Sequence, residues 1–196
     1  LRRVVAHDIQ NPEIYYYLSS FLGDREQLDD ASELLIVGLT KFPRDVNLLY
    51  QHGVIFEKRG QRALALAEMQ KVLSFDANHP DALNFIAYHQ AENGEQLELA
   101  LSHALKALAA KESGYIVDTL GWIYYKLGRF EESREQLEKA SILQPDDPVI
   151  LEHLGDLYRA LDLWQAAEDA YRQVLNLDPK AEGVEGKLQL ILRQKQ

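Results

Sequence analysis

The sequence predicts an all-α fold, a solenoid of about five helical hairpins followed by a C-terminal capping helix. Small residues recur every 34 residues, at Gly53, Ala87, Gly121 and Gly155, and other registers keep the same step. Each unit contains two stretches whose apolar residues recur at three- and four-residue spacing, which is the pattern of an amphipathic helix. A fixed period of this size is typical of repeat architectures, in which neighbouring hairpins stack to bury one continuous core.

The unit 148–181 illustrates the two helices of one hairpin. Asp162 lies in the turn between them, and Gly155 in the first helix allows the second helix to approach closely. Pro179 ends the second helix, because proline lacks an amide donor and clashes with the preceding turn. The apolar faces of the two helices consist of Leu151, Leu154, Leu157, Tyr158, Ala167, Ala170, Tyr171, Val174 and Leu175.

The whole chain, residues 1–196, is interpreted as a single array. Its expected units are 12–45, 46–79, 80–113, 114–147 and 148–181. Residues 1–11 are expected to be the tail of a truncated preceding unit, because Leu1, Val4 and Val5 match the closing face of a second helix. Residues 182–196 are expected to form a capping helix, with Val184, Leu188 and Ile191 on the face that covers the last repeat.

The third unit departs from the pattern. Its second-helix alanines, Ala100, Ala104 and Ala107, stand one place late. We therefore predict a one-residue insertion after Gly94 and a shortened exit at residues 110–113.

The unit 114–147 resembles a tetratricopeptide repeat. The residues at the small, aromatic and proline positions of that family are Leu120, Gly121, Tyr124, Gly128, Phe130, Ala140 and Pro145. The resemblance extends over nearly the whole chain, and it implies a right-handed superhelix that binds a protein or peptide and does not catalyse a reaction. Residues 118–122 with 128–130 are also similar to the C-terminal part of larger bacterial tetratricopeptide proteins, some of which are envelope adaptors. This implies a bacterial source and leaves the compartment open between cytoplasm and cell envelope.

The resemblance also implies the position of a binding groove. In this family, the concave surface is lined by side chains from about the second, fifth, sixth, ninth, twelfth and thirteenth places of each unit. The candidate groove residues at such places are Tyr16, Tyr17, Tyr50, Asn84, Phe85, Tyr88, Tyr115, Asp118, Trp122, Tyr125, His153 and Asp156.

The candidate groove is rich in aromatic residues, which offer large contact areas at low entropic cost and dominate binding hot spots. We expect it to bind an extended or helical peptide. Truncation of Tyr88 and Trp122 together is then expected to abolish binding with little loss of stability. The alternative for each ring is packing against a neighbouring repeat. Carboxylates of Asp118, Glu152 and Asp156 are expected either to contact a basic residue of the partner or to form a solvated helix face.

Composition narrows the classes of function. The net charge of −10 disfavours nucleic acid as a partner and favours a basic segment of another protein. The absence of cysteine excludes thiolate metal sites, and no histidine pair has the spacing of a helical zinc site. No glycine-rich phosphate-binding motif is present. We therefore expect no catalytic residue, no metal and no cofactor, and we expect His52 to lie in the core.

Two further expectations concern association. No apolar run approaches the roughly 20 residues of a membrane span, so no membrane insertion is expected. The apolar face of residues 1–11 offers an alternative function, self-association into a homodimer through terminal repeats. A third hypothesis is that the array serves as a scaffold within a larger protein.

Overall fold

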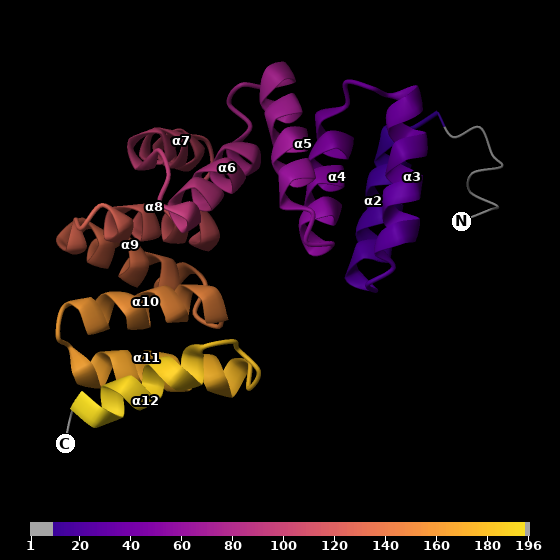
Figure 1. Ribbon diagram of the computed structural model, residues 1–196. Coiled ribbons are helices and arrows are strands. Elements are labelled where there is room, and N and C mark those ends of the chain that lie inside the picture. The colour runs from indigo at the N-terminus through magenta and orange to yellow at the C-terminus, as the bar shows by residue number, and fades with distance from the viewer. Residues whose placement is uncertain (1–9, 195–196) are drawn as a thin grey trace. The chain divides into compact units, whose positions relative to one another are not determined.

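The computed structural model describes residues 10–194 of the chain as eleven helices, and that range contains no strand (Figure 1). The all-α prediction is therefore confirmed. The chain divides into two compact units, residues 1–85 (unit 1) and 86–196 (unit 2), which are described separately. The predicted tail of a preceding repeat, with Leu1, Val4 and Val5, lies almost wholly outside the described residues.

Unit 1 consists of two helical hairpins and the start of a third. Each helix packs against the next from α2 to α5, and α2 also contacts α4. The helices are α2 (Pro12–Asp24), α3 (Leu28–Lys41), α4 (Val46–Lys58), α5 (Arg62–Phe75) and the first half of α6 (Pro80–Asn93).

Unit 2 begins within α6 and continues the same alternation. Successive helices pack on each other from α7 to α12, and α8 also contacts α10. The helices are α7 (Leu97–Ala110), α8 (Gly114–Lys126), α9 (Phe130–Leu143), α10 (Pro148–Ala160), α11 (Trp164–Leu177) and α12 (Val184–Gln194). The helices fall two to each expected 34-residue unit, and the five-unit division remains our proposal.

Local sequence determines where the helices begin. The side chain of Asp45 accepts hydrogen bonds from the N–H groups of Asn47 and Leu48, both at 3.0 Å, so it caps α4. Asn11 caps α2 and Asp147 caps α10 in the same way. These caps satisfy amide groups that have no partner within the helix.

The turns inside the hairpins require a left-handed residue. Gly60, Gly94 and Gly128 adopt φ values of 70°, 67° and 72° there. Glu26 and Asp162 occupy the equivalent places with φ values of 61° and 59°, a conformation that is costly for a residue with a side chain.

The repeated small residue is needed for close packing within each hairpin, as predicted. A Cβ on Gly155 would lie 2.4 Å from Cε1 of Tyr171, and a Cβ on Gly121 would lie 2.7 Å from Cγ of Leu137. In both cases the obstructing side chain comes from the second helix of the same hairpin. The two predicted features of the third unit are also confirmed, since α7 begins at Leu97 and only three residues separate it from α8.

The C-terminal helix covers the last hairpin. Val184, Leu188 and Ile191 are at most 5% exposed and pack with Tyr171 and Val174 of α11. This is the face that was predicted for the capping helix.

Candidate functional site

In each unit the candidate residues lie on the first helices of the hairpins, which are α2, α4 and the start of α6 in unit 1, and the rest of α6, α8 and α10 in unit 2. We call their side chains at the six places given above the first-helix face. Because α2 contacts α4 and α8 contacts α10, side chains from consecutive repeats meet on it. Unit 1 contains Tyr16, Tyr17, Tyr50, Asn84 and Phe85 of the predicted set, and unit 2 contains the other seven.

In unit 1, this face contains a pocket of about 240 Å³ at the starts of α2 and α4. Tyr17 is 66% exposed there, and its ring meets that of Tyr16 edge to face, with centroids 5.4 Å apart. The pocket is lined by Pro12, Glu13, Tyr16, Tyr17, Asp45 and Asn47. Two predicted residues therefore face a real concavity.

The pocket forms because two neighbouring first helices begin side by side. Asn11 and Asp45 cap α2 and α4, and the capping bonds fix where each first turn starts. Tyr16 and Tyr17 follow one turn later on α2. Sequence reasoning did not select Glu13 or Asp45 for the site, although the aspartate directly before an apolar stretch was a readable capping signal.

The remaining predicted residues of unit 1 are partly used by the protein itself. The ring of Tyr50 stacks on His79 with centroids 5.4 Å apart. Asn84 is 8% exposed, and its Oδ1 atom has no hydrogen-bond partner. Phe85 is half-buried. None of these three lines the pocket of α2 and α4.

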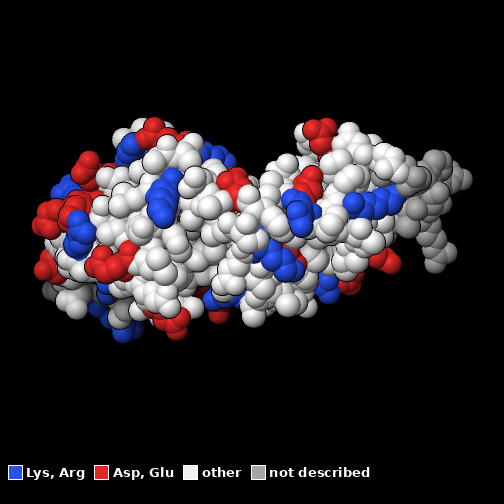
Figure 2. Space-filling model, turned by 90° about the horizontal axis from the view of Figure 1, so that it is seen from above, with Lys and Arg blue, Asp and Glu red and all other residues white. Residues whose placement is uncertain are grey.

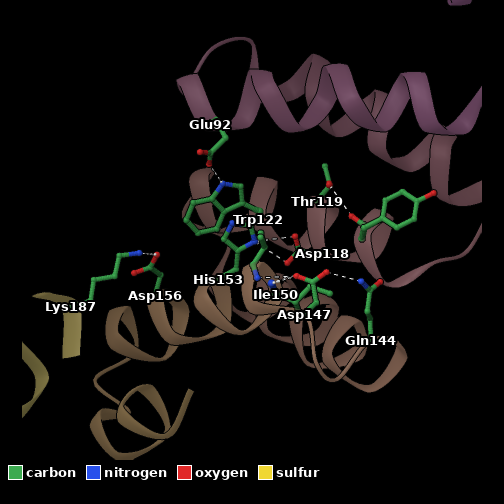
Figure 3. Close-up of polar contacts among 12 residues, drawn as sticks. Glu92, Asp118, Thr119, Trp122, Gln144, Asp147, Ile150, His153, Asp156 and Lys187 are labelled. Atoms are coloured by element: carbon green, nitrogen blue, oxygen red, sulfur yellow. Dashed lines mark hydrogen bonds and ion pairs between the residues drawn. The ribbon is translucent and has the colours of Figure 1, made fainter. Parts of the chain in front are cut away.

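In unit 2, the predicted aromatic residues form an internal stack. Trp122 is 6% exposed, and its ring lies between those of Tyr125 and His153, with centroid distances of 4.7 and 4.0 Å. Its Nε1–H group donates to Glu92 at 2.6 Å (Figure 3). This position does not support the expectation that Trp122 can be truncated with little loss of stability, because the indole is a buried and hydrogen-bonded part of the packing.

His153 of this stack forms a buried pair with Asp118. Both side chains are at most 7% exposed, and His153 Nδ1 lies 2.9 and 3.0 Å from the two carboxylate oxygens of Asp118. Burial by itself lowers the pKa of His153. The charge of Asp118, the hydrogen bond to it and the charges of Glu92 and Asp156 outweigh burial and raise that pKa above its ordinary value. In its protonated form His153 forms an ion pair with Asp118.

Asp156 and Glu152 share one cation, which comes from the C-terminal helix. Lys187 of α12 donates to Asp156 at 2.6 Å (Figure 3). It also donates to Glu152 at 2.7 Å, and the hydroxyl of Tyr171 donates to Asp156 at 2.8 Å. Although burial lowers the pKa of Lys187, these hydrogen bonds and charges raise it overall. Asp118 and Asp156 are buried and paired within the chain, so the prediction that they form a solvated helix face is wrong.

The last two predicted residues of unit 2 are more open. Tyr115 is 36% exposed and has Nζ of Lys111 at 5.4 Å from its ring centroid. Tyr88 is half-buried, and its centroid lies 6.4 Å from that of His153. Sequence reasoning missed Lys187, whose role depends on how α12 packs.

A serine, a histidine and a carboxylate come together elsewhere in unit 1. His52 lies 3.3 Å from the Ser32 hydroxyl through Nε2 and 3.5 Å from Glu68 through Nδ1. All three residues are at most 7% exposed, and Ser32 lies inside α3, where helical hydrogen bonds use the backbone amides that an oxyanion hole would need. The predicted core position of His52 is confirmed, and the geometry is that of a buried polar link between helices.

The surface has mixed charge. The face drawn in Figure 2 shows acidic and basic side chains close to one another with uncharged areas between them. Within residues 10–194 no three metal-binding side chains come together. In the same range, every helix is too short or too polar to cross a membrane.

Comparisons with known proteins agree with this architecture. A family model of the tetratricopeptide repeat matches residues 119–182. A TPR repeat-containing protein of Pseudomonas aeruginosa is 33% identical over 153 residues, which are 74% of this chain and 24% of that protein. The chain thus spans about a quarter of the length of this relative, whose origin fits the predicted bacterial source.

Two solved structures show the same fold. A chain of the APC/C hetero-tetramer Cut9–Hcn1 matches with a TM-score of 0.86 and 15% identity, over 100% of this chain and 39% of that one. YrrB, a TPR protein with an unusual peptide-binding site, matches with a TM-score of 0.65 and 15% identity, over 99% of this chain and 96% of its own.

Proposed function

Because the chain belongs to the tetratricopeptide-repeat family, whose members generally serve as protein-interaction modules, we propose that it binds a peptide segment of a partner protein through the first-helix face of unit 1. This refines the groove expected from the sequence. In unit 2, Asp118, Trp122, His153 and Asp156 are instead buried and have partners within the chain.

The observation that supports this proposal is the pocket lined by Tyr16, Tyr17 and Asn47. Its volume of about 240 Å³ suits one large side chain of a ligand better than a whole small molecule, since ligand pockets usually measure about 300–1,000 Å³. The exposed ring of Tyr17 and the half-buried ring of Tyr16 provide contact area, and Asn47 provides an amide that can bond a peptide backbone.

The experiment is a selection from a random peptide library against the purified chain. The test variant is Tyr17→Ala with Asn47→Ala, two exposed positions whose change should alter stability by about 0.5 kcal/mol or less. The matched control is Phe75→Ala, a residue of unit 1 that is 49% exposed and does not line the pocket.

Selected peptides should bind the native chain and the control equally, and the test variant about tenfold more weakly or worse. Peptides that bind all three proteins alike would place recognition elsewhere. Failure to select any peptide would remove the support for a peptide-binding role.

We further propose that the array itself is not catalytic. Ser32, His52 and Glu68 come together among the described residues, but Ser32 lies inside α3, where helical hydrogen bonds use the backbone amides that an oxyanion hole would need. Alanine substitution of Ser32 should therefore change stability and leave peptide binding intact.

A second candidate function is self-association, and α2 carries the observation that favours it. Ile14 and Phe21 are 42% and 55% exposed, whereas the residues 34 places later, Leu48 and Ile55, are fully buried. Sedimentation of the native chain against Ile14→Gln with Phe21→Gln tests this reading. A dimer that the substitutions dissociate would support it, and a native monomer would exclude it.

A further inference from the structure

We propose that the pocket at the starts of α2 and α4 binds a cationic side chain, specifically an arginine of the partner segment. This inference rests on the proposed function and names the chemistry of its ligand. It follows from the charges, the rings and the contrast with other carboxylates of the same face.

The charge of the pocket is negative. Glu13 and Asp45 are among its lining residues, and none of the residues that line it is basic. The two helix N-termini oppose these carboxylates with about half a positive charge each, or about +1 together against −2. Asp45 and Asn11 already accept hydrogen bonds from the first turns, so these amides are not available to an anionic ligand.

The rings favour a planar cation. Tyr16 and Tyr17 stand at 80° to each other, so they present both a ring edge and a ring face. A guanidinium group stacks on an aromatic face and donates to carboxylates in a fork geometry. Arginine can therefore use the tyrosines and the carboxylates of this pocket at the same time.

Two other carboxylates of the first-helix faces, both in unit 2, already have partners within the chain and are not available to an arginine. Asp118 is paired with His153, and Asp156 is paired with Lys187. Among the described residues, no ion pair involves Glu13 or Asp45. The basic partner segment predicted from the net charge would thus meet its carboxylates in unit 1, and not at the places in unit 2 that sequence reasoning selected.

The test uses Nα-acetyl-arginine methylamide and its citrulline analogue, in which a neutral urea replaces the guanidinium group. Each compound is titrated into the ¹⁵N-labelled chain, and the amide signals of Glu13, Tyr17 and Asn47 are followed by NMR. We expect the arginine compound to give saturable shifts at these residues, and the citrulline compound to bind at least about fivefold more weakly. Equal affinities, or shifts confined to other residues, would overturn the proposal.

The variant Glu13→Gln with Asp45→Asn removes both charges and keeps the helix cap, because asparagine and aspartate cap equally well. It should weaken the arginine compound about fivefold, the size expected of two exposed ion pairs. The control, Asp30→Asn with Glu33→Gln, makes the same change of charge on α3 at exposed positions outside the pocket. If both variants weaken binding equally, the effect is one of net charge, and the proposal fails.

The two proposals fail in different ways. Selected peptides that lack a basic residue, and bind Glu13→Gln with Asp45→Asn as tightly as the native chain, would overturn the arginine site and leave the peptide-binding function standing. If no peptide is selected, the titration with the blocked amino acids still decides whether the pocket distinguishes a guanidinium from a urea.

Discussion

The first-helix faces of the two units carry similar kinds of side chains, and the protein uses them in different ways. In unit 1, Tyr17 is 66% exposed beside a pocket, and Glu13 of the same pocket has no ion-pair partner among the described residues. In unit 2, Trp122 is 6% exposed, and the carboxylates of Asp118 and Asp156 are paired with His153 and Lys187. Much of the first-helix face thus serves packing in unit 2, whereas its part at the starts of α2 and α4 stays open in unit 1.

This difference separates stability from recognition. A buried polar network stabilises a structure only when each member has its partner, and it then offers nothing to a ligand. Exposed tyrosines and unpaired carboxylates contribute little to stability and remain available for binding. The four predictions below test this contrast, beginning with the largest expected effect.

The first prediction compares one aromatic residue from each unit. Trp122→Ala should lower the free energy of unfolding by about 4 kcal/mol, because it leaves a cavity and removes the hydrogen bond to Glu92. Tyr17→Ala, at an exposed position, should change it by about 0.5 kcal/mol or less. Urea unfolding followed by circular dichroism measures both.

Comparable losses from the two substitutions would abolish the distinction between the units. Tyr17 would then be part of the packing, and its use as a binding determinant would lose its basis.

The second prediction concerns the buried pair of unit 2. Asp118→Asn should cost about 3 kcal/mol near pH 6, the low end for breaking a buried pair, since asparagine can still hydrogen-bond to the ring of His153. The folded-state pKa of His153 is raised, so the native pair contributes fully at pH values below the unfolded-state pKa of about 6.5. That contribution is lost as the pH rises through the folded-state pKa.

The measurement is the free energy of unfolding of both proteins at a series of pH values from 6 to 9. The difference between the native chain and Asp118→Asn should shrink as the pH rises. The variant in unit 1, Asp45→Asn, should show no such trend. A pH-independent difference for Asp118→Asn would mean that His153 is neutral in the folded protein.

The fold could be predicted because its signals are local and repeated. A left-handed turn residue, a small residue at the helix crossing and an apolar spacing each act within one hairpin, and their recurrence reinforces the assignment. Even the shifted start of α7 was visible in the position of Ala100 and Ala104. These features depend on sterics and hydrogen bonds between residues close together in the chain.

The candidate site was predicted less completely, because membership of a face does not tell whether a side chain has an internal partner. Of the predicted groove residues, Tyr16 and Tyr17 line a pocket, whereas Asp118 and Trp122 are buried. The prediction did not consider the offset between successive first helices. Asp118 pairs with His153, and Glu152 pairs with Lys187, each with a partner 35 residues later. This spacing could have been found in the sequence.

The third prediction tests the contact between α12 and α10. Lys187→Met keeps an unbranched side chain that is one atom shorter and removes its charge, leaving Asp156 and Glu152 without their common partner. We expect a loss of about 1–2 kcal/mol, since charged hydrogen bonds are worth about 1.5–3 kcal/mol and this lysine is partly exposed. Hydrogen exchange should also accelerate in α12. If the stability does not change, the ion pairs of Lys187 contribute nothing measurable, as is common for exposed salt bridges.

The fourth prediction has the smallest expected effect and concerns a turn in unit 1. Glu26 holds φ at 61° in the turn between α2 and α3, where Gly60 of the next hairpin holds 70°. Glu26→Gly should raise the free energy of unfolding by about 0.5–1 kcal/mol, because glycine adopts this conformation without a steric penalty and the penalty for glutamate exceeds the entropy that glycine loses. Peptide binding should stay unchanged, since the turn lies outside the pocket. If the variant is more stable and binds peptide with the same affinity, then binding at this face does not depend on a destabilised hairpin. A parallel loss of affinity would instead tie recognition to motion of α2.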